Sequence, residues 1–208
     1  MLINNLGSLK ANLATYMFHQ RFAPNYDTAV QNFEAVANRR LRVRPMEAVT
    51  DLITVNGVAA LPADYLLWRA VKNGTQPYLP ELDYVHPAYL PPTVTIAGTP
   101  FTHPPIVFTI EGNNLITRPI NDGVAWQLHY YQKIPTINGN DINSNWLITE
   151  HPDFYLEGTL TELFALGRNA EGAQLHKARR DELLQEIIQL YALTTGATSP
   201  AMRTGEYY

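Results

Sequence analysis

Apolar residues recur at three- and four-residue steps in two segments near the start of the chain, which is the period of an amphipathic helix. The first segment is Ser8–Phe22, where Ser8 can cap a helix and Pro24 can end it. In the second segment, Asp27 offers a cap and an apolar stripe extends to Leu41. The pattern therefore predicts two N-terminal helices.

The pattern changes at Met46, where β-branched residues cluster and turn dipeptides appear. Asn56-Gly57 is the favoured centre of a two-residue hairpin turn. The proline-rich segment Pro77–Pro105 predicts an irregular crossing, with at most a short helix near His86–Leu90. The expected strands are Ala48–Val55, Val58–Leu61, Leu66–Val71, Ile106–Ile110, Leu115–Arg118 and Ala125–Ile134. We expect roughly five to seven short antiparallel strands in a small barrel or sandwich.

The last third of the chain returns to the helical period. His151–Leu166 carries apolar residues on one face, with Pro152 in the first turn and Gly167 at the exit. The last predicted helix is Ala170–Thr194. Its Lys177–Glu182 portion is polar on nearly every side, so we expect this half to be solvated or held by a partner.

These elements predict an α+β fold, in which N- and C-terminal helices form a helical bundle with an inserted antiparallel β-barrel or sandwich domain. Each terminal pair of helices is too short to bury its apolar stripe alone, so the two pairs should pack together. The expected domains are residues 1–45 and 145–196 for the bundle and residues 46–144 for the β domain. Residues 197–208 lack the pattern of a packed element and are expected to form an extended C-terminal tail.

Composition narrows the class of protein. Of the 208 residues, 16% are charged, against roughly 25% in an ordinary soluble domain. Either uncharged polar residues cover a β-rich surface or, as we prefer, neighbouring subunits cover part of it. The net charge of −4 argues against a free nucleic-acid-binding protein that relies on overall positive charge.

No run of about 18 apolar residues occurs, and Met1–Leu13 lacks a basic start before an apolar run, so neither a membrane span nor a secretion signal is expected.

The sequence carries no standard catalytic motif: phosphate loop, dinucleotide fingerprint, HExxH and GxSxG are all absent. Without cysteine, disulfides, thiolate nucleophiles and cysteine-based zinc sites are excluded. Ordinary core or surface roles are expected for His129 and His176. Glu81, Asp83 and Glu111 can in principle supply a pair of glycosidase acids, but their spacing does not single them out. We expect no enzyme activity, no cofactor and no metal.

The stretch Asn145–Leu156, which reads NWLITEHPDFYL, contains a His-Pro-Asp tripeptide at His151–Asp153. In chaperone J-domains this tripeptide joins two helices of an all-helical unit, whereas here we expect strand and turn to precede it. A proline fixes φ in a first helical turn, and a carboxylate favours the positive end of the helix dipole. We therefore interpret the tripeptide as the start of a helix.

The most concentrated charge in the chain is a run of arginines. Its members are Arg39, Arg40, Arg42 and Arg44. In one interpretation these cations complement the negative end of the second predicted helix. In the other, Arg40, Arg42 and Arg44 lie on one face of an extended segment and meet phosphates or an acidic partner surface.

Four segments of the chain, with a hairpin between them and a long helix after them, carry a family resemblance. They are FEAVANRRLRVRPMEA at Phe33–Ala48, LPADYLLWRAVKNG at Leu61–Gly74, LDYVHPAYL at Leu82–Leu90 and NWLITEHPDFYLEGTLTELFAL at Asn145–Leu166. In this order and spacing they resemble the phage adaptor family. These are the head-to-tail joining proteins, or connectors, of tailed bacteriophages, which include the tail tubular A type.

The resemblance implies a helical bundle carrying a β-barrel-like domain, assembled as a ring of about twelve copies beneath the portal. The implied partners are the portal protein, tail or nozzle proteins and other copies of the chain, with genome DNA passing through the channel without sequence-specific binding. Portal contact falls to Ala197–Tyr208, with Arg203, Tyr207 and Tyr208 as candidate anchors. Channel or neighbour contacts fall to Arg39, Arg40, Arg42 and Arg44. The implied location is the neck of the virion, after assembly in the host cytoplasm, with no membrane involved.

Two alternative functions remain open from the sequence. The first is a tail-completion or nozzle subunit with the same mixed fold. The second is a carbohydrate-binding or carbohydrate-cleaving protein that uses the aromatic-rich segment Met46–Ile137.

Overall fold

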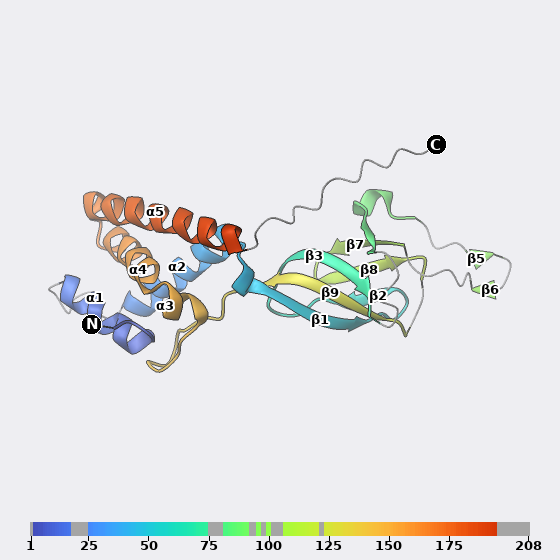
Figure 1. Ribbon diagram of the computed structural model, residues 1–208, viewed down its shortest axis with the longest axis horizontal. Helices are drawn as coiled ribbons and strands as arrows, with labels where there is room; N and C mark the ends of the chain where they lie inside the picture. The colour runs from blue at the N-terminus through green and yellow to red at the C-terminus, as the bar shows by residue number, and fades with distance from the viewer. Residues whose placement is uncertain are drawn as a thin grey trace. The chain divides into compact units, whose positions relative to one another are not determined.

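The computed structural model describes residues 2–17, 25–74, 81–91, 95–96, 99–100, 106–120 and 123–194. The chain forms two compact units, one made of Met1–Pro45 and Ile134–Tyr208 and the other of Met46–Lys133 (Figure 1). The described part of the first unit is built on helices and that of the second on strands, which confirms the predicted α+β class. Residues 134–144, which the sequence pattern placed with the strands, group with the helices.

The helical unit is organised around one central helix. Its helices are α1 Leu6–Met17, α2 Tyr26–Arg40, α3 Trp146–Glu150, α4 Pro152–Leu166 and α5 Ala170–Thr194. The expectation that strand and turn precede His151 is wrong, because α3 ends there. Helix α4 contacts each of the other four. Phe33 of α2 is fully buried against the rings of Phe154 and Tyr155 on α4, with ring centroids 5.1 and 4.9 Å away in edge-on geometry. Such aromatic pairs stabilise a core beyond the area that they bury.

The first two helices begin ahead of the residues that the sequence suggested as caps. Asn5 Oδ1 accepts a hydrogen bond from the N–H of Ser8 at 2.8 Å, and Ser8 Oγ accepts one from the N–H of Asn5 at 3.1 Å. This reciprocal pair is a capping box, so Ser8 lies inside the first turn of α1. Asp27 lies in the first turn of α2, where its carboxylate pairs with Lys10 at 2.9 Å. The end of the first predicted helix, Phe18–Phe22, falls outside the described residues.

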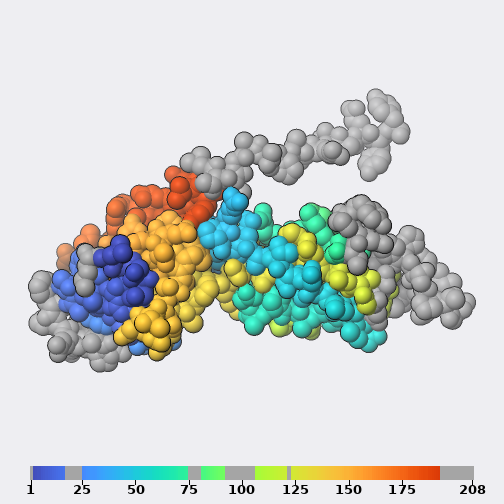
Figure 2. Space-filling view, turned by 60° about the horizontal axis from the view of Figure 1, so that its bottom comes forward, coloured from blue at the N-terminus to red at the C-terminus, as the bar shows by residue number. Residues whose placement is uncertain are grey.

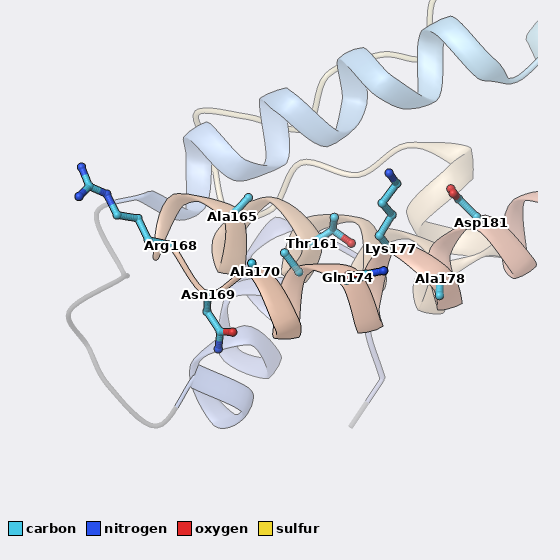
Figure 3. Close-up of a pocket in the computed structure, with 10 residues that line it drawn as sticks. Thr161, Ala165, Arg168, Asn169, Ala170, Gln174, Lys177, Ala178 and Asp181 are labelled. Carbon is cyan, nitrogen blue, oxygen red and sulfur yellow. The ribbon is translucent and has the colours of Figure 1, made fainter.

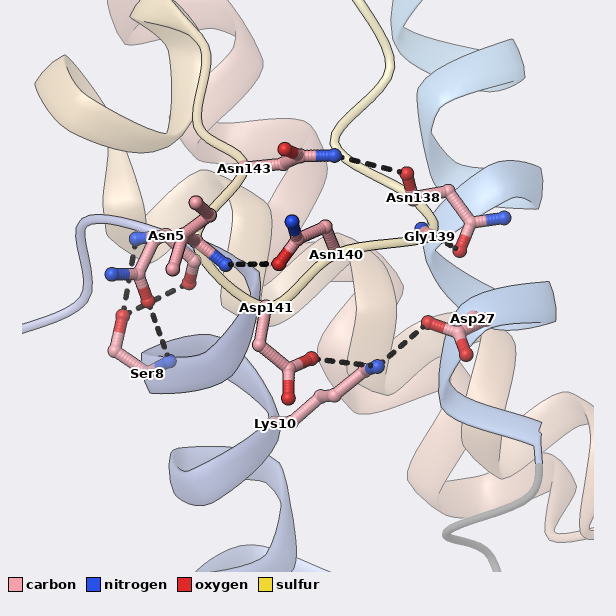
Figure 4. A network of polar contacts seen from close by, with 10 residues as sticks. Asn5, Ser8, Lys10, Asp27, Asn138, Gly139, Asn140, Asp141 and Asn143 are labelled. Atoms are coloured by element: carbon pink, nitrogen blue, oxygen red, sulfur yellow. Dashed lines mark hydrogen bonds and ion pairs between the residues drawn. The ribbon is translucent and has the colours of Figure 1, made fainter.

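A polar network fixes α1 against the turn of residues 138–143 (Figure 4). Lys10 Nζ lies 3.1 Å from Asp141 Oδ1. The backbone N–H groups of Leu6 and Gly7 donate to two carbonyls of this turn, at 3.0 and 2.8 Å. The first N–H groups of a helix have no partner within it, so the turn supplies acceptors that α1 lacks. Figure 2 shows α1, in blue, directly beside the orange segment that contains α3 and α4.

The second unit contains two larger sheets and one short strand pair. Its described strands are β1 Glu47–Ile53, β2 Val58–Ala60, β3 Tyr65–Asn73, β4 Asp83–Tyr84, β5 Thr95–Ile96, β6 Thr99–Pro100, β7 Val107–Glu111, β8 Asn114–Arg118 and β9 Ala125–Gln132. The sheet orders are β1-β9-β3, β2-β8-β7-β4 and β5-β6. Phe108, Leu115, Trp126 and Leu128 bring residues of both larger sheets into one buried cluster. Among the described strands no sheet closes on itself, so the barrel alternative is wrong, and the shared core is that of a sandwich.

The turn at Asn56-Gly57 forms as predicted, with φ of 55° and 72°, but it does not join a regular hairpin. Strand β1 pairs with β9 and β2 pairs with β8, and only Val55 and Val58 bridge across the turn. Leu52 and Ala59 both enter the shared core, so each side of the turn serves a different sheet. The prediction of purely antiparallel strands is also wrong, because β4 pairs in parallel with β7.

Candidate functional site

A groove of about 670 Å³ lies along α4 and the N-terminal half of α5, and we call it the α4–α5 groove (Figure 3). Short side chains line it, those of Ala165 on α4 and of Ala170, Ala173 and Ala178 on α5. Figure 3 shows Arg168 and Lys177 extending away from the ribbon on either side of Ala165 and Ala170. Both cations are exposed, and neither side chain has a partner among the described residues. The groove therefore combines an apolar floor with two free positive charges.

The tight turn between α4 and α5 positions Arg168. The N–H of Asn169 donates to the carbonyl of Phe164 at 2.9 Å, and the N–H of Arg168 donates to that of Ala165 at 3.1 Å. These two bonds form the Schellman motif, which normally has glycine in its left-handed position. Here that position is held by Arg168, with φ of 57°, and the predicted exit residue Gly167 precedes it with an ordinary φ of −76°. Asn169 Oδ1 then accepts from the N–H of Gly172 at 3.0 Å, in the first turn of α5.

Asp181, which also lines the groove, joins α5 to α2. Its Oδ1 lies 2.5 Å from Arg40 Nη1 and accepts hydrogen bonds from Arg180 Nε and Nη2 at 3.1 and 3.0 Å. Burial alone raises the pKa of Asp181, but the hydrogen bonds from Arg40 and Arg180 outweigh it and lower that pKa. Because two guanidinium groups neutralise this carboxylate, the unbalanced charge of the groove is that of Arg168 and Lys177.

The four arginines of the basic run occupy different environments. Arg39 and Arg40 lie in the last turn of α2, and Arg42 Nη1 donates to the carbonyls of Asn38, at 2.7 Å, and of Leu41. These contacts agree with the interpretation that the cations complement the helix end. The shared extended face that the second interpretation requires of Arg40, Arg42 and Arg44 is not present, because Arg40 belongs to α2 and pairs with Asp181. Arg39 and Arg44 are exposed, and the channel or neighbour contacts expected of the run stay a prediction.

The candidate portal anchors Arg203, Tyr207 and Tyr208 lie outside the described residues, as does the rest of the tail. Their role therefore stays a prediction.

The two histidines considered from the sequence, His129 and His176, have structural partners. His176 Nδ1 lies 2.7 Å from Glu157 Oε2, and its ring stacks on Phe164. His129 Nε2 lies 3.2 Å from Gln127 Oε1, and burial lowers the pKa of His129. No group of three His, Asp or Glu residues suited to a metal occurs in the described part of the chain. No described helix is long and apolar enough to span a membrane.

The possible glycosidase acids are separated along the sheet. Asp83 lies beside Val107 in the parallel pairing of β4 and β7. Glu111 is four residues further along β7, a distance of roughly 13 Å at 3.3 Å per residue. This is a spacing of backbone positions, and no described contact joins the Asp83 and Glu111 side chains, so the structure does not single them out as a pair. Glu81 pairs with Lys72 at 3.0 Å.

The aromatic residues of the β unit contact one another. Trp68 stacks on Tyr84 with centroids 5.3 Å apart and meets the ring of Phe108 at 5.2 Å. The facing sides of Trp68 and Tyr84 are thereby occupied within the unit. These ring contacts do not support the second alternative, a carbohydrate-binding or carbohydrate-cleaving protein.

Only an indirect indication of the α4–α5 groove could be read from residue types. The polar character of Lys177–Glu182 suggested a partner-held surface, and the groove includes Lys177 and Asp181 from this segment. Nothing in the sequence pointed to Arg168, because an arginine with a left-handed backbone conformation cannot be recognised from residue type alone.

Comparison with known proteins extends over nearly the whole chain. A family model described as SU10 adaptor protein matches residues 4–204, which includes all described helices and strands of both units. No curated protein matches the chain. The match confirms the resemblance inferred from the four sequence segments. The chain therefore belongs to the SU10 adaptor protein family, a family of phage head-to-tail adaptors.

Proposed function

We propose that this protein is a structural subunit of the virion neck that forms a ring under the portal, links the capsid vertex to the tail and surrounds part of the DNA ejection channel. The observation that carries the proposal is the family match over residues 4–204. An adaptor joins two bodies, so its function resides in complementary surfaces rather than in catalysis. The ring has about twelve copies, in keeping with the closed symmetry of most homo-oligomers.

The helices act in this proposal as one bundle that holds the ring together. The central position of α4, which contacts every other described α-helix, supports this role. Assembly takes place in the host cytoplasm, with the portal as template and the tail or nozzle proteins bound afterwards.

Portal contact belongs in this proposal to residues 197–208. Arg203 supplies a cation, and Tyr207 and Tyr208 supply aromatic anchors of the kind that dominate binding energy at interfaces. Arg39 and Arg44 are exposed members of the basic run without a described partner, and they face either genome DNA or a neighbouring subunit. Few such charges suit a channel through which DNA must slide, since each phosphate contact strengthens binding.

Electron microscopy of the purified protein mixed with its portal tests the adaptor role. A ring stacked on the portal is the expected image. Labelled protein at the distal end of the tail would instead identify a nozzle or tail-completion subunit, and no binding to either would contradict the proposal.

Co-sedimentation with the portal tests the assignment of residues 197–208. The chain shortened after Gly196 should keep its circular dichroism spectrum and thermal midpoint but lose portal binding. A full-length Arg203→Ala, Tyr207→Ala, Tyr208→Ala variant controls for chain length and should show the same loss. Unimpaired binding of both proteins would contradict the assignment.

A further inference from the structure

Helix α5 carries a second distinctive surface, which we call the outer flank and define as Leu175, Glu182, Glu186 and Leu190. Leu175 is 69% exposed and Leu190 is 49% exposed, and both glutamates are exposed. Leucines this exposed on a helix of a folded unit are apolar surface without a described partner. Glu186 has no hydrogen bond or ion pair among the described residues, and the 3.0 Å pair between Glu182 and Arg179 is too exposed to hold strongly.

The outer flank keeps a net negative charge. Arg179 lies on the same side of α5, where it pairs with Glu182 at 3.0 Å and interacts electrostatically with Glu186, so two carboxylates face one guanidinium. A hollow of about 270 Å³ beside Glu186 and Leu190 is also lined by His151 and Asp153. Burial lowers the pKa of His151, so this imidazole is uncharged at neutral pH. The outer flank is therefore apolar and acidic.

The outer flank and the α4–α5 groove lie on opposite sides of α5. Lys177 and Glu186 are nine residues apart, which at about 100° per residue places them about 180° apart around the helix axis. A ring built head to tail requires two different surfaces on opposite sides of each subunit, whereas an isologous dimer requires one self-complementary surface. The placement on α5 meets the requirement of a ring.

The chemistry of the two surfaces is complementary. The groove has an alanine floor that accepts large apolar side chains, and its free charges are the cations of Arg168 and Lys177. The outer flank projects large apolar side chains, and its two carboxylates, Glu182 and Glu186, exceed the single cation Arg179 by one charge. Ridges of one helix fit into grooves between others when the groove residues are small enough.

We propose that the outer flank of one copy docks into the α4–α5 groove of the next copy, with Leu190 on the alanine floor and Glu186 facing Lys177 and Arg168. This rests on the proposed ring and names the surfaces by which its subunits hold one another. Arg168 has a left-handed backbone conformation that glycine adopts more readily. In the proposed docking its guanidinium binds the carboxylate of Glu186, which accounts for an arginine at this position.

Cross-linking between introduced cysteines tests the contact. The natural chain contains no cysteine, so only the introduced residues can react. A Lys177→Cys, Glu186→Cys variant treated with a short bismaleimide should give a ladder of dimers, trimers and longer oligomers, because the two positions cannot meet within one helix. Lys177→Cys and Glu186→Cys alone should stay monomeric. A Glu171→Cys, Gln185→Cys variant, exposed on the same helix but outside both surfaces, is the matched control. A ladder no stronger than that of the control, or dimers from either single variant, would overturn the proposal.

Charge reversal provides an independent test by sedimentation velocity. Lys177→Glu and Glu186→Lys should each weaken self-association roughly tenfold, since each replaces an attraction with a repulsion at every interface. The double variant Lys177→Glu, Glu186→Lys should recover most of the association, as should an equal mixture of the two single variants. Equal weakening in the single and double variants would overturn the pairing.

Both tests are run on the free protein at high concentration and on the protein bound to portal, which separates the two proposals. Portal binding without the cross-linked ladder overturns the docking surfaces and leaves the adaptor role intact. A ladder in the free protein without portal binding supports the docking surfaces and overturns the adaptor role.

Discussion

Gly158 of α4 lies directly against the ring of Phe33 of α2. A Cβ added to Gly158 would be 2.0 Å from Phe33 Cδ2 and 2.1 Å from Cε2, distances that no carbon pair tolerates. Phe33 is fully buried and held on its other sides by Phe154 and Tyr155, so the ring has no free space to move into. The absence of a side chain at residue 158 is thus what allows α2 and α4 to approach.

Gly158→Ala should destabilise the helical unit by about 2 kcal/mol, because overpacking exceeds the roughly 1 kcal/mol that alanine gains over glycine in a helix. Urea denaturation followed by circular dichroism measures the change. In a Phe33→Leu background the ring is gone, and Gly158→Ala should become neutral or stabilising. The same loss in both backgrounds would show that the contact with the ring is not the cause.

A buried carboxylate ties α2 to α4 and to the segment that leaves the β unit. Glu34 is 5% exposed and accepts hydrogen bonds from the Tyr155 hydroxyl at 2.5 Å, the Thr136 hydroxyl at 2.6 Å and the N–H of Ile137 at 2.9 Å. Glu34→Gln replaces one acceptor oxygen with a donor that faces other donors, so a loss of about 2 kcal/mol is expected. Glu162→Gln, on α4 and without a described partner, is the control and should change the unfolding free energy little. Equal effects would refute the role of Glu34.

The contact between Tyr155 and Glu34 makes the free energy of unfolding depend on pH in the alkaline range. Burial and the adjacent Glu34 carboxylate raise the pKa of Tyr155 above its usual 10. Above pH 10 the unfolded chain loses the phenol proton while the folded chain keeps it, so stability is full below pH 10 and falls as pH rises. The expected slope is about 1.4 kcal/mol per pH unit for this residue. Unfolding free energies between pH 8 and pH 11 should therefore fall less steeply in Tyr155→Phe, and parallel curves would contradict the assignment.

Sequence patterns located those parts of the fold that depend on local chemistry. The bounds of α5 were predicted from helical periodicity, and Pro152 and Asp153 occupy the first turn of α4 as expected. Patterns did not reveal contacts between residues far apart in the chain. The turn at Asn138-Gly139 forms where it was expected, but the N–H groups of Ile137 and Ile134 donate to Glu34 and Asn38 of α2. The α4–α5 groove likewise depends on how two helices pack, which residue type alone does not reveal.

The two arginines that bind Asp181 should contribute unequally to stability. In the pair of Arg40 and Asp181 both side chains are more than one third exposed, so Arg40→Ala should cost less than about 1 kcal/mol. Arg180 is only 6% exposed. Asp181→Asn leaves the buried guanidinium of Arg180 without an anion, which should lower the unfolding free energy by about 2–3 kcal/mol. Adding Arg180→Met to Asp181→Asn should recover most of that loss in urea denaturation. A larger effect for Arg40→Ala than for Asp181→Asn would reverse this ranking.

Arg168 should lower the free energy of unfolding while strengthening self-association. Arg168→Ala and Arg168→Gly both remove the guanidinium, but only glycine relieves the left-handed backbone at φ 57°. Arg168→Gly should therefore be more stable than Arg168→Ala by about 1 kcal/mol in urea denaturation. Both should weaken self-association equally in sedimentation velocity, whereas Arg168→Lys keeps the cation and should keep most of the association. If glycine raised stability and left assembly untouched, the arginine would have no role at the groove, and its left-handed backbone would lack an explanation.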